Sequence, residues 1–306
     1  MSTVREIVVP TQSGSELRAV LKIYDRRFGL DLRQVNGRPD PHRAVHEHVF
    51  QSFVKDGKMT GFLRDHEHKT RDQGSAVWAS SYLDKTQHGR ARYEAALWQE
   101  CANHFECETE AYSRLSQLQG SLIPYMYAHV RITGANETQP SSPSTARYFE
   151  IRGVLLQAIG GYKLWDIATA PGAPANPEAW QAIIQSAANA AHEINKRGVF
   201  MEDCAPRNVV VDSCTQRPFI IDLAQCEFRD RLTEVWQAMD DDDDDEDSDP
   251  DVRYWQLMRQ SNNPGKIGAP MVRRLQLQKG MKLQDLTYPD YDGIIRDLRR
   301  RKGLNG

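Results

Sequence analysis

The first part of the chain alternates between apolar and polar positions. In the segment SELRAVLKIYD, every second residue from Leu17 to Ile23 is apolar, and Val20 and Lys22 occupy the opposite face. A period of two residues is typical of a half-buried strand. The same kind of signal predicts three further strands, within residues 5–10, 122–133 and 147–159.

Helical spacing begins further along the chain. Residues 98–118 carry a helical pattern that ends before Gly120, a residue suited to a helix C-cap. Asn176, which precedes a proline, has the residue type of a helix N-cap. The apolar residues after it recur at helical spacing until Gly198, so we predict a long, buried helix there.

Residues 29–95 are polar and rich in Arg, Asp, His and Gly, and we interpret them as a long insertion or a partly helical excursion. Two patterns within them, HEH at 46–48 and DHEH at 65–68, would each place two histidines on one face of a strand, as metal ligands can be. A solvated insertion is the preferred interpretation of both patterns.

The composition fits a folded globular protein. The chain has 306 residues, of which 40% are hydrophobic and 26% are charged, enough for one large core or two lobes. Its apolar stretches are shorter than the roughly 18 residues that a membrane span needs. The N-terminus lacks the apolar core of a secretory signal. We therefore expect a cytoplasmic protein that does not enter a membrane.

Ten carboxylates are concentrated in residues 240–251, DDDDDDEDSDPD, in a chain whose net charge is only −3. A run of like charges repels itself and does not pack, so we predict a solvated loop. A docking site for a basic partner protein is the alternative. The basic segment RRRK near the C-terminus is explained as the charged end of a helix, so binding to nucleic acid is not predicted.

Five cysteines, at positions 101, 107, 204, 214 and 226, form no C-x-x-C motif. An odd number without that spacing predicts neither a disulfide framework nor a thiolate zinc site. We therefore expect buried free thiols.

The strongest chemical signal lies in the second half of the chain. Two short apolar strands, NVVVD and PFIIDL, flank the segment SCTQR and predict an antiparallel hairpin. Pairing about Thr215 places Asn208 opposite Asp222, with Cα atoms roughly 5 Å apart. An amide oxygen and a carboxylate this close favour Mg²⁺, which accepts oxygen ligands and keeps other positions for water and phosphates. Asp203, on the preceding loop, could accept a proton from an attacking hydroxyl group.

These residues resemble motifs of the protein-kinase-like superfamily. In its motif residues, the chain is most similar to fungal kinase-like proteins related to aminoglycoside phosphotransferases. By this resemblance, Asp203 to Asn208 takes the place of the catalytic loop Asp-x-x-x-x-Asn, with Asp203 as the base and Asn208 as a metal ligand. Asp222, in IIDLAQ, then occupies the metal-binding position of the Asp-Phe-Gly motif.

The resemblance also implies residues that bind the nucleotide. Lys22, in AVLKIYD, looks like the strand lysine that holds the α and β phosphates, and Val20 would lie over the adenine. The segment LLQAIGGYKL looks like the hinge, which implies that Gln157 and Ile159 lie beside the nucleotide.

Two carboxylates compete for the place of the helix glutamate that pairs with this lysine. Ala111, Tyr112 and Leu115 define an inward helix face. Glu108 precedes them at helical spacing and shares that face. Glu110 points roughly 160° away from Glu108 at about 100° per residue. We therefore choose Glu108.

The chain also departs from the family pattern. It contains no G-x-G-x-x-G motif, and only about sixteen residues precede the strand of Lys22, too few for the usual glycine-rich loop and its strands. The catalytic loop begins with MED where the family has His-Arg-Asp or His-Gly-Asp, and LA replaces Phe-Gly after Asp222. The loss of the arginine of His-Arg-Asp argues against control by activation-loop phosphorylation. No Ala-Pro-Glu follows Asp222, so we expect no peptide-docking platform.

Taken together, these signals predict an α+β chain with a bilobal protein-kinase-like fold. Residues 1–157 would form a small antiparallel β lobe with one main helix and the 29–95 insertion. Residues 158–306 would form a larger, mostly helical lobe that contains the catalytic hairpin 203–223 and the acidic loop 240–251.

The leading hypothesis for function is a phosphotransferase that uses ATP and Mg²⁺ to move the γ-phosphoryl group to a hydroxyl group of a small molecule or a protein. The alternative is a catalytically inactive pseudokinase that acts as a binding or scaffolding module. An acidic interaction protein with a degenerate kinase fold is the weakest hypothesis, because it rests on the aspartate run alone. No motif specifies the acceptor or the oligomeric state.

Overall fold

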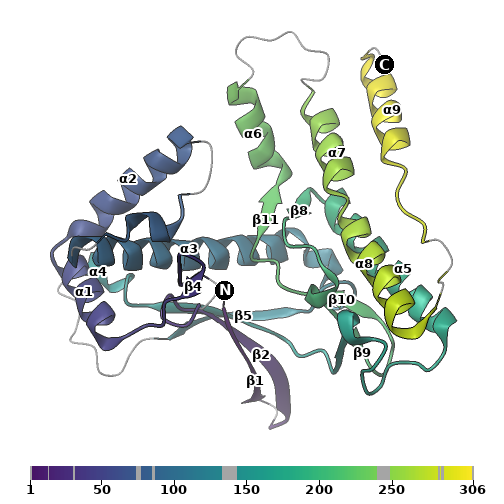
Figure 1. The fold of residues 1–306 in the computed structure, drawn as a ribbon, viewed down its shortest axis with the longest axis horizontal. Helices are drawn as coiled ribbons and strands as arrows, with labels where there is room; N and C mark the ends of the chain where they lie inside the picture. The colour runs from purple at the N-terminus through teal and green to yellow at the C-terminus, as the bar shows by residue number, and fades with distance from the viewer. Residues whose placement is uncertain are drawn as a thin grey trace. The chain divides into compact units, whose positions relative to one another are not determined.

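Helices and short antiparallel sheets alternate along the chain in the computed structural model (Figure 1). The described residues are 2–12, 14–29, 32–73, 77–84, 87–132, 143–239, 249–281, 283 and 286–304. They form two units, the first from Met1–Glu106 and Met126–Gln157, the second from Cys107–Tyr125 and Ala158–Gly306. The predicted α+β class and the small antiparallel sheet are confirmed.

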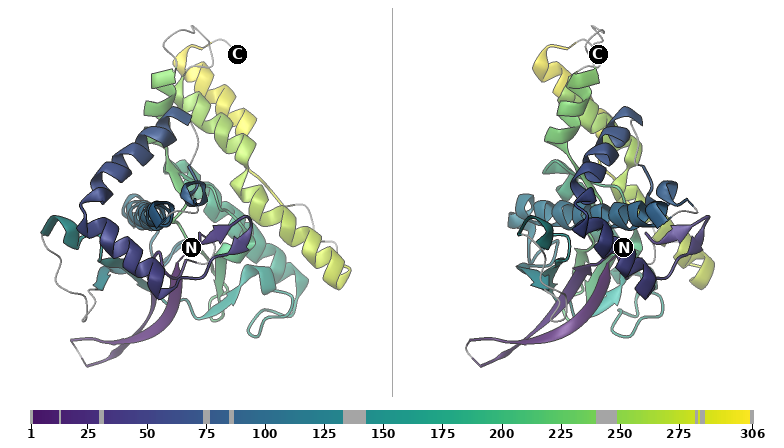
Figure 2. Two further views of the ribbon diagram at one scale, coloured as in Figure 1. Left: turned by 60° about the vertical axis from the view of Figure 1, so that its left-hand side comes forward. Right: turned by 90° about the vertical axis from the view of Figure 1, so that its left-hand side faces the viewer.

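A four-stranded antiparallel sheet organises part of the first unit. Its strands lie in the order β1 (Thr3–Pro10), β2 (Glu16–Tyr24), β6 (Ile151–Gln157) and β5 (Met126–Ile132). These are the four strands that the alternating pattern predicts. Figures 1 and 2 show β1 and β2 as a long, curved hairpin. Gly14, in the turn of this hairpin, has a φ of +79°, where glycine carries no Cβ penalty.

The predicted insertion is a folded helical layer with a core of its own. It contains β3 (Gln34–Val35), β4 (Arg38–Pro39), α1 (Ala44–Lys55), α2 (Lys58–Gln73), η1 (Ala79–Tyr82) and the start of α3 (Gln87–Arg114). Buried side chains of this core include Val49, Phe50, Phe53, Val54, Met59 and Leu97. The short helix α4 (Pro143–Ala146) follows later in the chain and precedes β6.

The histidine patterns do not form metal sites of the kind considered from the sequence. His46 and His48 lie in α1, and His66 and His68 lie in α2, so none of them is in a strand. Residues two positions apart on a helix do not face each other, so neither pair shares a face. His46 instead is buried, with Nδ1 3.8 Å from the carboxylate of Glu94.

A buried group of charges joins α3 to the segment after β2. The carboxylate of Glu94 accepts a hydrogen bond of 2.7 Å from Arg26 and bonds of 2.7 and 2.9 Å from Arg33. Arg26 also pairs with Glu47. Burial alone would raise the pKa of Glu94, but the bonds and charges of the two arginines outweigh it and hold this pKa below its ordinary value.

The helix α3 begins earlier and ends earlier than predicted, at Gln87 and Arg114 in place of residues 98 and 118. Gly120 is therefore not its C-cap, because the turn η2 (Ser116–Leu118) intervenes. Gly120 has a φ of +74° and donates its N–H to the carbonyl of Ile123 at 2.7 Å. Small buried residues such as Ala91 and Ala95 line the early turns of α3, and they give a weak apolar signal in the sequence.

The second unit is mostly helical. The predicted helix is α5 (Pro177–Lys196), with its N-cap at Asn176, and it packs against α8 (Asn263–Lys279). His192 lies against the rings of Trp255 and Tyr291, with centroids 6.0 and 5.9 Å away. Burial lowers the pKa of His192, as expected for a neutral core histidine rather than a solvent-facing base.

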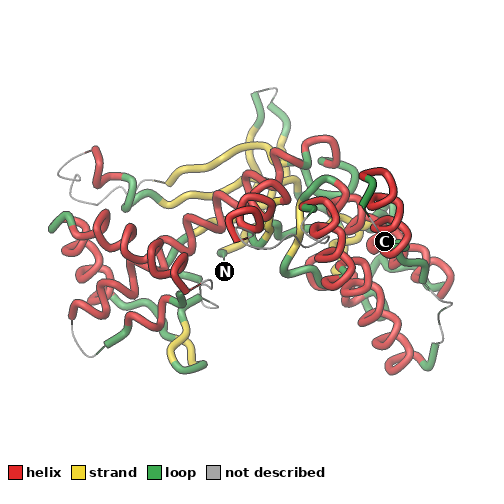
Figure 3. Tube along the Cα trace, turned by 90° about the horizontal axis from the view of Figure 1, so that it is seen from above, coloured by secondary structure: helices red, strands yellow, loops and turns green. Residues whose placement is uncertain are grey.

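Three further helices complete the second unit as described: α6 (Arg229–Met239), α7 (Pro250–Ser261) and α9 (Tyr291–Lys302). Figure 3, where helices are red, shows how densely helices occur around the C-terminus. α7 and α9 pack against each other, and Phe200, Tyr254, Met258 and Tyr291 form a buried cluster among these elements. None of the helices in the described part of the chain is both long and apolar enough to cross a membrane.

The end of the acidic run is structured, whereas residues 240–248 lie outside the described residues. Asp249 is the N-cap of α7, and its carboxylate accepts the backbone N–H groups of Asp251 and Val252 at 2.9 and 3.1 Å. Lys302, at the end of α9, bonds to Asp249 and Asp251 at 2.7 Å. Asp251 also pairs with Arg229. The predicted solvated loop is therefore wrong for Asp249 and Asp251.

Substitution of Asp249 should destabilise the second unit. Asp249→Ala removes the N-cap of α7 and the ion pair to Lys302, so we expect the free energy of unfolding to fall by about 1 kcal/mol or slightly more. Asp249→Asn keeps a capping oxygen and should cost less. Urea unfolding of the three proteins measures the difference, and equal stability of all three would contradict the assigned cap.

Substitution of Glu94 should be far more damaging. Glu94→Gln leaves two buried guanidinium groups without their shared carboxylate, and we expect a loss of about 3–5 kcal/mol. The matched control is Glu106→Gln in the same helix. The side chain of Glu106 is 64% exposed and pairs with Arg152, so a loss of about 1 kcal/mol or less is expected there.

The contribution of Glu94 to stability should also depend on pH. Because the folded pKa of Glu94 is depressed, its stabilising contribution is present above the ordinary carboxyl pKa and is lost on acidification below it. Urea unfolding across pH tests both statements.

Candidate active site

The residues predicted for the site are distributed over the two units. Those of the first unit are Val20, Lys22 and Gln157. Those of the second unit are Glu108, Ile159, Asp203, Asn208 and Asp222. Each group is positioned within its own unit, so the pairing of Lys22 with Glu108 stays a prediction. Ile159 is partly buried in the segment between β6 and β7 (Gly161–Lys163).

Lys22 is a buried residue of the interior strand β2. Its side chain is only 4% exposed, and its Nζ atom lies 5.4 Å from the centre of the Tyr24 ring. Lys22 occupies the face opposite the apolar residues of the alternating pattern, as predicted, and it is nevertheless buried there together with Tyr24. A surface lysine is thereby excluded. Val20 and Gln157, both partly buried, occupy neighbouring ladder positions on β2 and β6.

Two short antiparallel strand pairs position the predicted catalytic loop. β8 (Val199–Met201) pairs with β11 (Cys226–Phe228), and β9 (Val209–Asp212) pairs with β10 (Pro218–Ile220). The segment from Asp203 to Asn208 connects β8 to β9. The segment that contains Asp222 connects β10 to β11. Both segments therefore run between the same two strand pairs, which holds them side by side.

Backbone hydrogen bonds extend these two pairings into the connecting segments. Glu202 donates its N–H to the carbonyl of Gln225 at 3.0 Å, and Ile221 donates its N–H to the carbonyl of Asn208 at 2.9 Å. β7 adds a third strand beside β9, and there a Cβ atom on Gly161 would lie 1.7 Å from the carbonyl oxygen of Val211. Glycine is thus required for the close approach of β7.

The side chains of Asp203 and Asn208 bond to each other. The amide nitrogen of Asn208 donates to one carboxylate oxygen of Asp203 at 3.0 Å and to the backbone carbonyl of Asp203 at 2.9 Å. Arg207, from the turn η4 (Pro206–Asn208), pairs with the other carboxylate oxygen. These bonds employ both hydrogens of the Asn208 amide, so its side-chain oxygen is the atom left to accept a ligand.

The register of the hairpin differs by one residue from the predicted one. Val209 pairs with Ile220 and Val211 with Pro218, which aligns Asn208 with Ile221 rather than with Asp222. The cause lies in the turn. The carboxylate of Asp212 accepts hydrogen bonds from the backbone N–H groups of Cys214 and Thr215 and closes a loop that the strand sequences do not reveal.

Asp222 follows β10 with a left-handed backbone. Its φ is +63°, which is uncommon for a residue other than glycine and costs roughly 1–3 kcal/mol unless the surroundings enforce it. Such strained positions are concentrated at functional sites. The left-handed residue turns the chain between β10 and β11, so that Asp222 lies at the bend of the segment beside Asp203 and Asn208.

Glu108 is fully buried and contacts the residue after Asp222. Its carboxylate accepts the backbone N–H of Leu223 at 3.2 Å. Glu110, the competing carboxylate, is partly exposed and pairs with Arg114 and Arg231. The inward orientation predicted for Glu108 is confirmed, and the helix α3 thereby contacts the segment of Asp222.

A thiol pair beside this segment was not singled out from the sequence. The sulfur of Cys107 accepts the backbone N–H of Cys226 at 3.2 Å and lies 3.3 Å from the carbonyl oxygen of Cys226. All five cysteines are free, as predicted, although Cys107 is only partly buried and Cys214 is exposed. The adjacency of Cys107 to Glu108 is the one signal in the sequence that could have drawn attention to this pair.

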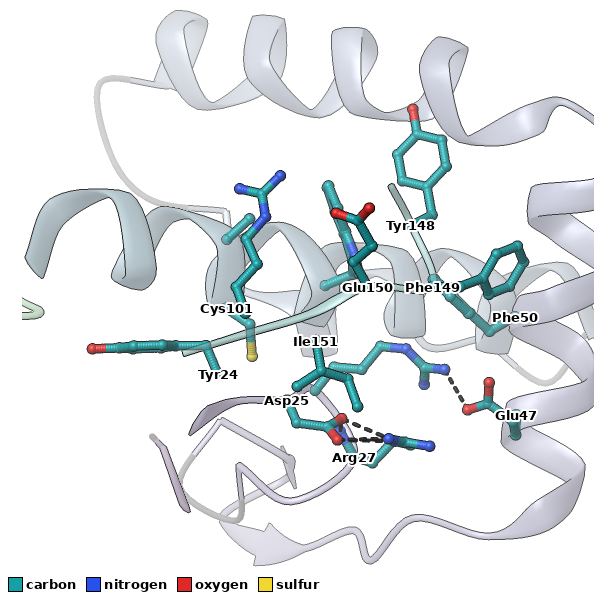
Figure 4. Close-up of a pocket in the computed structure, with 14 residues that line it drawn as sticks. Tyr24, Asp25, Arg27, Glu47, Phe50, Cys101, Tyr148, Phe149, Glu150 and Ile151 are labelled. Atoms are coloured by element: carbon teal, nitrogen blue, oxygen red, sulfur yellow. Dashed lines mark hydrogen bonds and ion pairs between the residues drawn. The ribbon is translucent and has the colours of Figure 1, made fainter. Parts of the chain in front are cut away.

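A small cavity in the first unit is separate from the predicted nucleotide residues. It has a volume of about 40 Å³ and is lined by fourteen residues, none of which belongs to the predicted site. Figure 4 shows its charged side, where Asp25 and Arg27 form paired hydrogen bonds of 2.8–3.0 Å. A volume of this size holds about one or two water molecules.

Two of the predicted site residues in the second unit carry oxygen atoms of the type that binds Mg²⁺. The side-chain oxygen of Asn208 and the carboxylate of Asp222 are hard oxygen ligands, which suit an ion that keeps water and phosphate in its remaining positions. In the part of the chain that the structure describes, no three His, Cys, Asp or Glu side chains form a complete metal site. A half-site completed by a phosphorylated ligand is the arrangement that these residues could support.

Comparisons with known proteins identify no family. No family model matches the chain, and no curated protein sequence matches it. Among solved structures, the chain is similar to WaaP in complex with acyl carrier protein, with 14% sequence identity over 65% of this chain and 76% of that chain. The TM-score of 0.27 is too low for this likeness to support an argument about fold or activity.

Proposed function

We propose that this chain is a kinase-like phosphotransferase that binds ATP with Mg²⁺ and transfers the γ-phosphoryl group to a hydroxyl group of a small molecule or a protein. The observation that carries the proposal is the grouping of Asp203, Asn208 and the Asp222 segment, with Glu108 bonded beside it. A bilobal kinase-like architecture, in which Lys22 serves the same site, is part of the proposal.

The proposed roles follow from the chemistry of the side chains. The acceptor hydroxyl gives its proton to the carboxylate of Asp203 while its oxygen attacks the γ-phosphorus. The bond from that phosphorus to the bridging oxygen breaks, and ADP leaves. Lys22 neutralises charge on the α and β phosphates. Mg²⁺, when held by Asn208 and Asp222, would supply further neutralisation of phosphate charge.

A catalytically inactive kinase-like binding module is the second candidate. The observation that favours it is that both carboxylate oxygens of Asp203 already have partners, one in Arg207 and the other in Asn208. A carboxylate held in this way can support the loop without accepting a proton. The two candidates share one fold and differ in the role of Asp203, so substitution of Asp203 distinguishes them.

Nucleotide binding should raise the thermal stability of the chain. At about 100 times its dissociation constant, Mg-ATP should stabilise the folded state by about 2.7 kcal/mol, which corresponds to a rise of several degrees in melting temperature. ADP without metal should have a smaller effect. A melting temperature that does not change across millimolar nucleotide, with and without Mg²⁺, would contradict the proposed phosphate site.

The roles of the two aspartates should separate by substitution. Asp203→Asn keeps the shape of the side chain but removes the proton acceptor, so we expect turnover to fall by about 100-fold or more while nucleotide affinity changes little. Asp222→Asn removes a metal-binding charge, so we expect Mg²⁺-dependent nucleotide binding itself to weaken. Phosphoryl transfer or slow ATP hydrolysis measures the first effect, and a binding titration measures the second.

The matched control for both substitutions is Asp292→Asn, because the side chain of Asp292 is 73% exposed and pairs only across the surface with Arg259. This variant should retain turnover and nucleotide affinity. Intact turnover in Asp203→Asn would support the inactive module. Intact Mg²⁺-dependent binding in Asp222→Asn would remove Asp222 from the metal site.

A further inference from the structure

Two thiols approach each other where α3 meets the Asp222 segment. The sulfur of Cys107 accepts the N–H of Cys226 at 3.2 Å, and its proton can reach the carbonyl oxygen of Cys226 at 3.3 Å or that of Leu223 at 3.7 Å. A disulfide joins residues whose Cα atoms are roughly 4.4–6.8 Å apart. The contact of the Cys107 sulfur with the Cys226 backbone makes Cys226 the candidate partner thiol. Both residues belong to the second unit.

The environment distinguishes the two sulfurs chemically. The hydrogen bond from the Cys226 thiol lowers the pKa of Cys107 below that of an ordinary thiol, against the opposing effects of burial and of Glu227 and Glu110. The same interaction and burial raise the pKa of Cys226. Cys107 is also the more exposed of the two. Cys107 is therefore the attacking thiol and Cys226 the resolving thiol, because nucleophilic reactivity depends on the thiolate and on access.

We propose that Cys107 and Cys226 form a reversible disulfide when the protein meets a peroxide, and that this bond displaces the backbone between Asp222 and Cys226. This oxidation modifies none of the residues to which we assign a role in phosphoryl transfer. The disulfide would be a modification site that regulates the neighbouring segment.

The reaction balances with hydrogen peroxide as the oxidant. The Cys107 thiolate attacks one peroxide oxygen, the O–O bond breaks, and the departing hydroxide takes up a proton to give water. The sulfur of Cys226 then attacks the sulfenic acid on Cys107, the S–O bond breaks, and the S–S bond forms. The second oxygen leaves as water with the proton of Cys226. Two thiols and one peroxide give one disulfide and two waters.

The disulfide would remove contacts that hold the segment in place. Oxidation takes away the thiol proton of Cys107, and with it the bond to the carbonyl of Leu223 or of Cys226. It also draws the Cys107 sulfur toward the Cys226 side chain and away from the N–H of Cys226. Leu223, whose N–H is bound by Glu108, is next to Asp222, so a shift there reaches the left-handed residue directly.

The first test maps the bond itself in the full-length chain. The reduced protein is treated with hydrogen peroxide, remaining thiols are blocked with N-ethylmaleimide, and the unreduced peptides are identified by mass spectrometry. We expect a peptide pair linked through Cys107 and Cys226 that disappears after dithiothreitol. Cys107→Ser should abolish this pair, whereas Cys214→Ser, at the exposed cysteine, should retain it. Blocked thiols at both positions, or a different linked pair, would overturn the proposal.

The second test measures the displaced segment without relying on activity. Hydrogen–deuterium exchange of peptides covering residues 222–226 should become faster after peroxide treatment of the wild type and remain unchanged in Cys107→Ser. Unchanged exchange in a wild-type protein that carries the disulfide would refute the displacement.

The consequence for nucleotide binding rests on the proposed function and is tested separately. Peroxide-treated wild type should lose the rise in melting temperature that Mg-ATP causes in the reduced protein, and Cys107→Ser should keep this rise. If reduced protein shows no rise, the proposed phosphotransferase fails, while peptide mapping and exchange still decide the disulfide. If oxidised and reduced wild type show the same rise, regulation by the disulfide is refuted.

Discussion

The candidate site depends on the antiparallel pairing of four strands that are each only three or four residues long. Isolated pairs of this length are marginal in water, and here they persist because residues such as Val199, Val209 and Ile220 are buried. The pairings fix where the chain leaves β8, enters β9, leaves β10 and enters β11. Asp203, Asn208 and Asp222 are thus positioned by backbone hydrogen bonds, and the side chains of Asp203 and Asn208 also bond to each other.

Periodicity in the sequence predicts a helix or strand well where its buried residues lie on one face. It does not predict a turn or a strand register that depends on the hydrogen bonds of a single side chain. The strands around Lys22 and the helix after Asn176 were recognisable because apolar residues recur at one spacing. The hairpin register was not, because the carboxylate of Asp212 shapes the turn. Asp249 before Pro250 offers the same signal as Asn176 before a proline, but the surrounding aspartates obscured it.

The predicted insertion shows a second limit of a sequence pattern. His46, Val49, Phe50 and Phe53 recur at helical spacing within α1, which fits the partly helical excursion that we predicted. The high polarity of the surrounding residues gave no sign that Val49, Phe50 and Phe53 belong to a buried core. A few of the charges are in fact part of the interior. Glu94 meets Arg26 and Arg33 across 68 and 61 residues of chain, and such pairing has no local signature.

Contacts from a distant part of the sequence also explain why the segment of Asp222 holds its strained conformation. Aspartate tolerates a left-handed backbone better than most residues other than glycine, but the conformation still costs free energy, so contacts with neighbours help to hold it. Leu223 provides the means, because Glu108 binds its N–H and Cys107 can bind its carbonyl. These two residues are adjacent on α3, so one turn of helix contacts both polar groups of a single residue. A change at the sulfur of Cys107 would therefore reach Asp222 through the backbone of Leu223, which is why the proposed disulfide bears on the segment of Asp222.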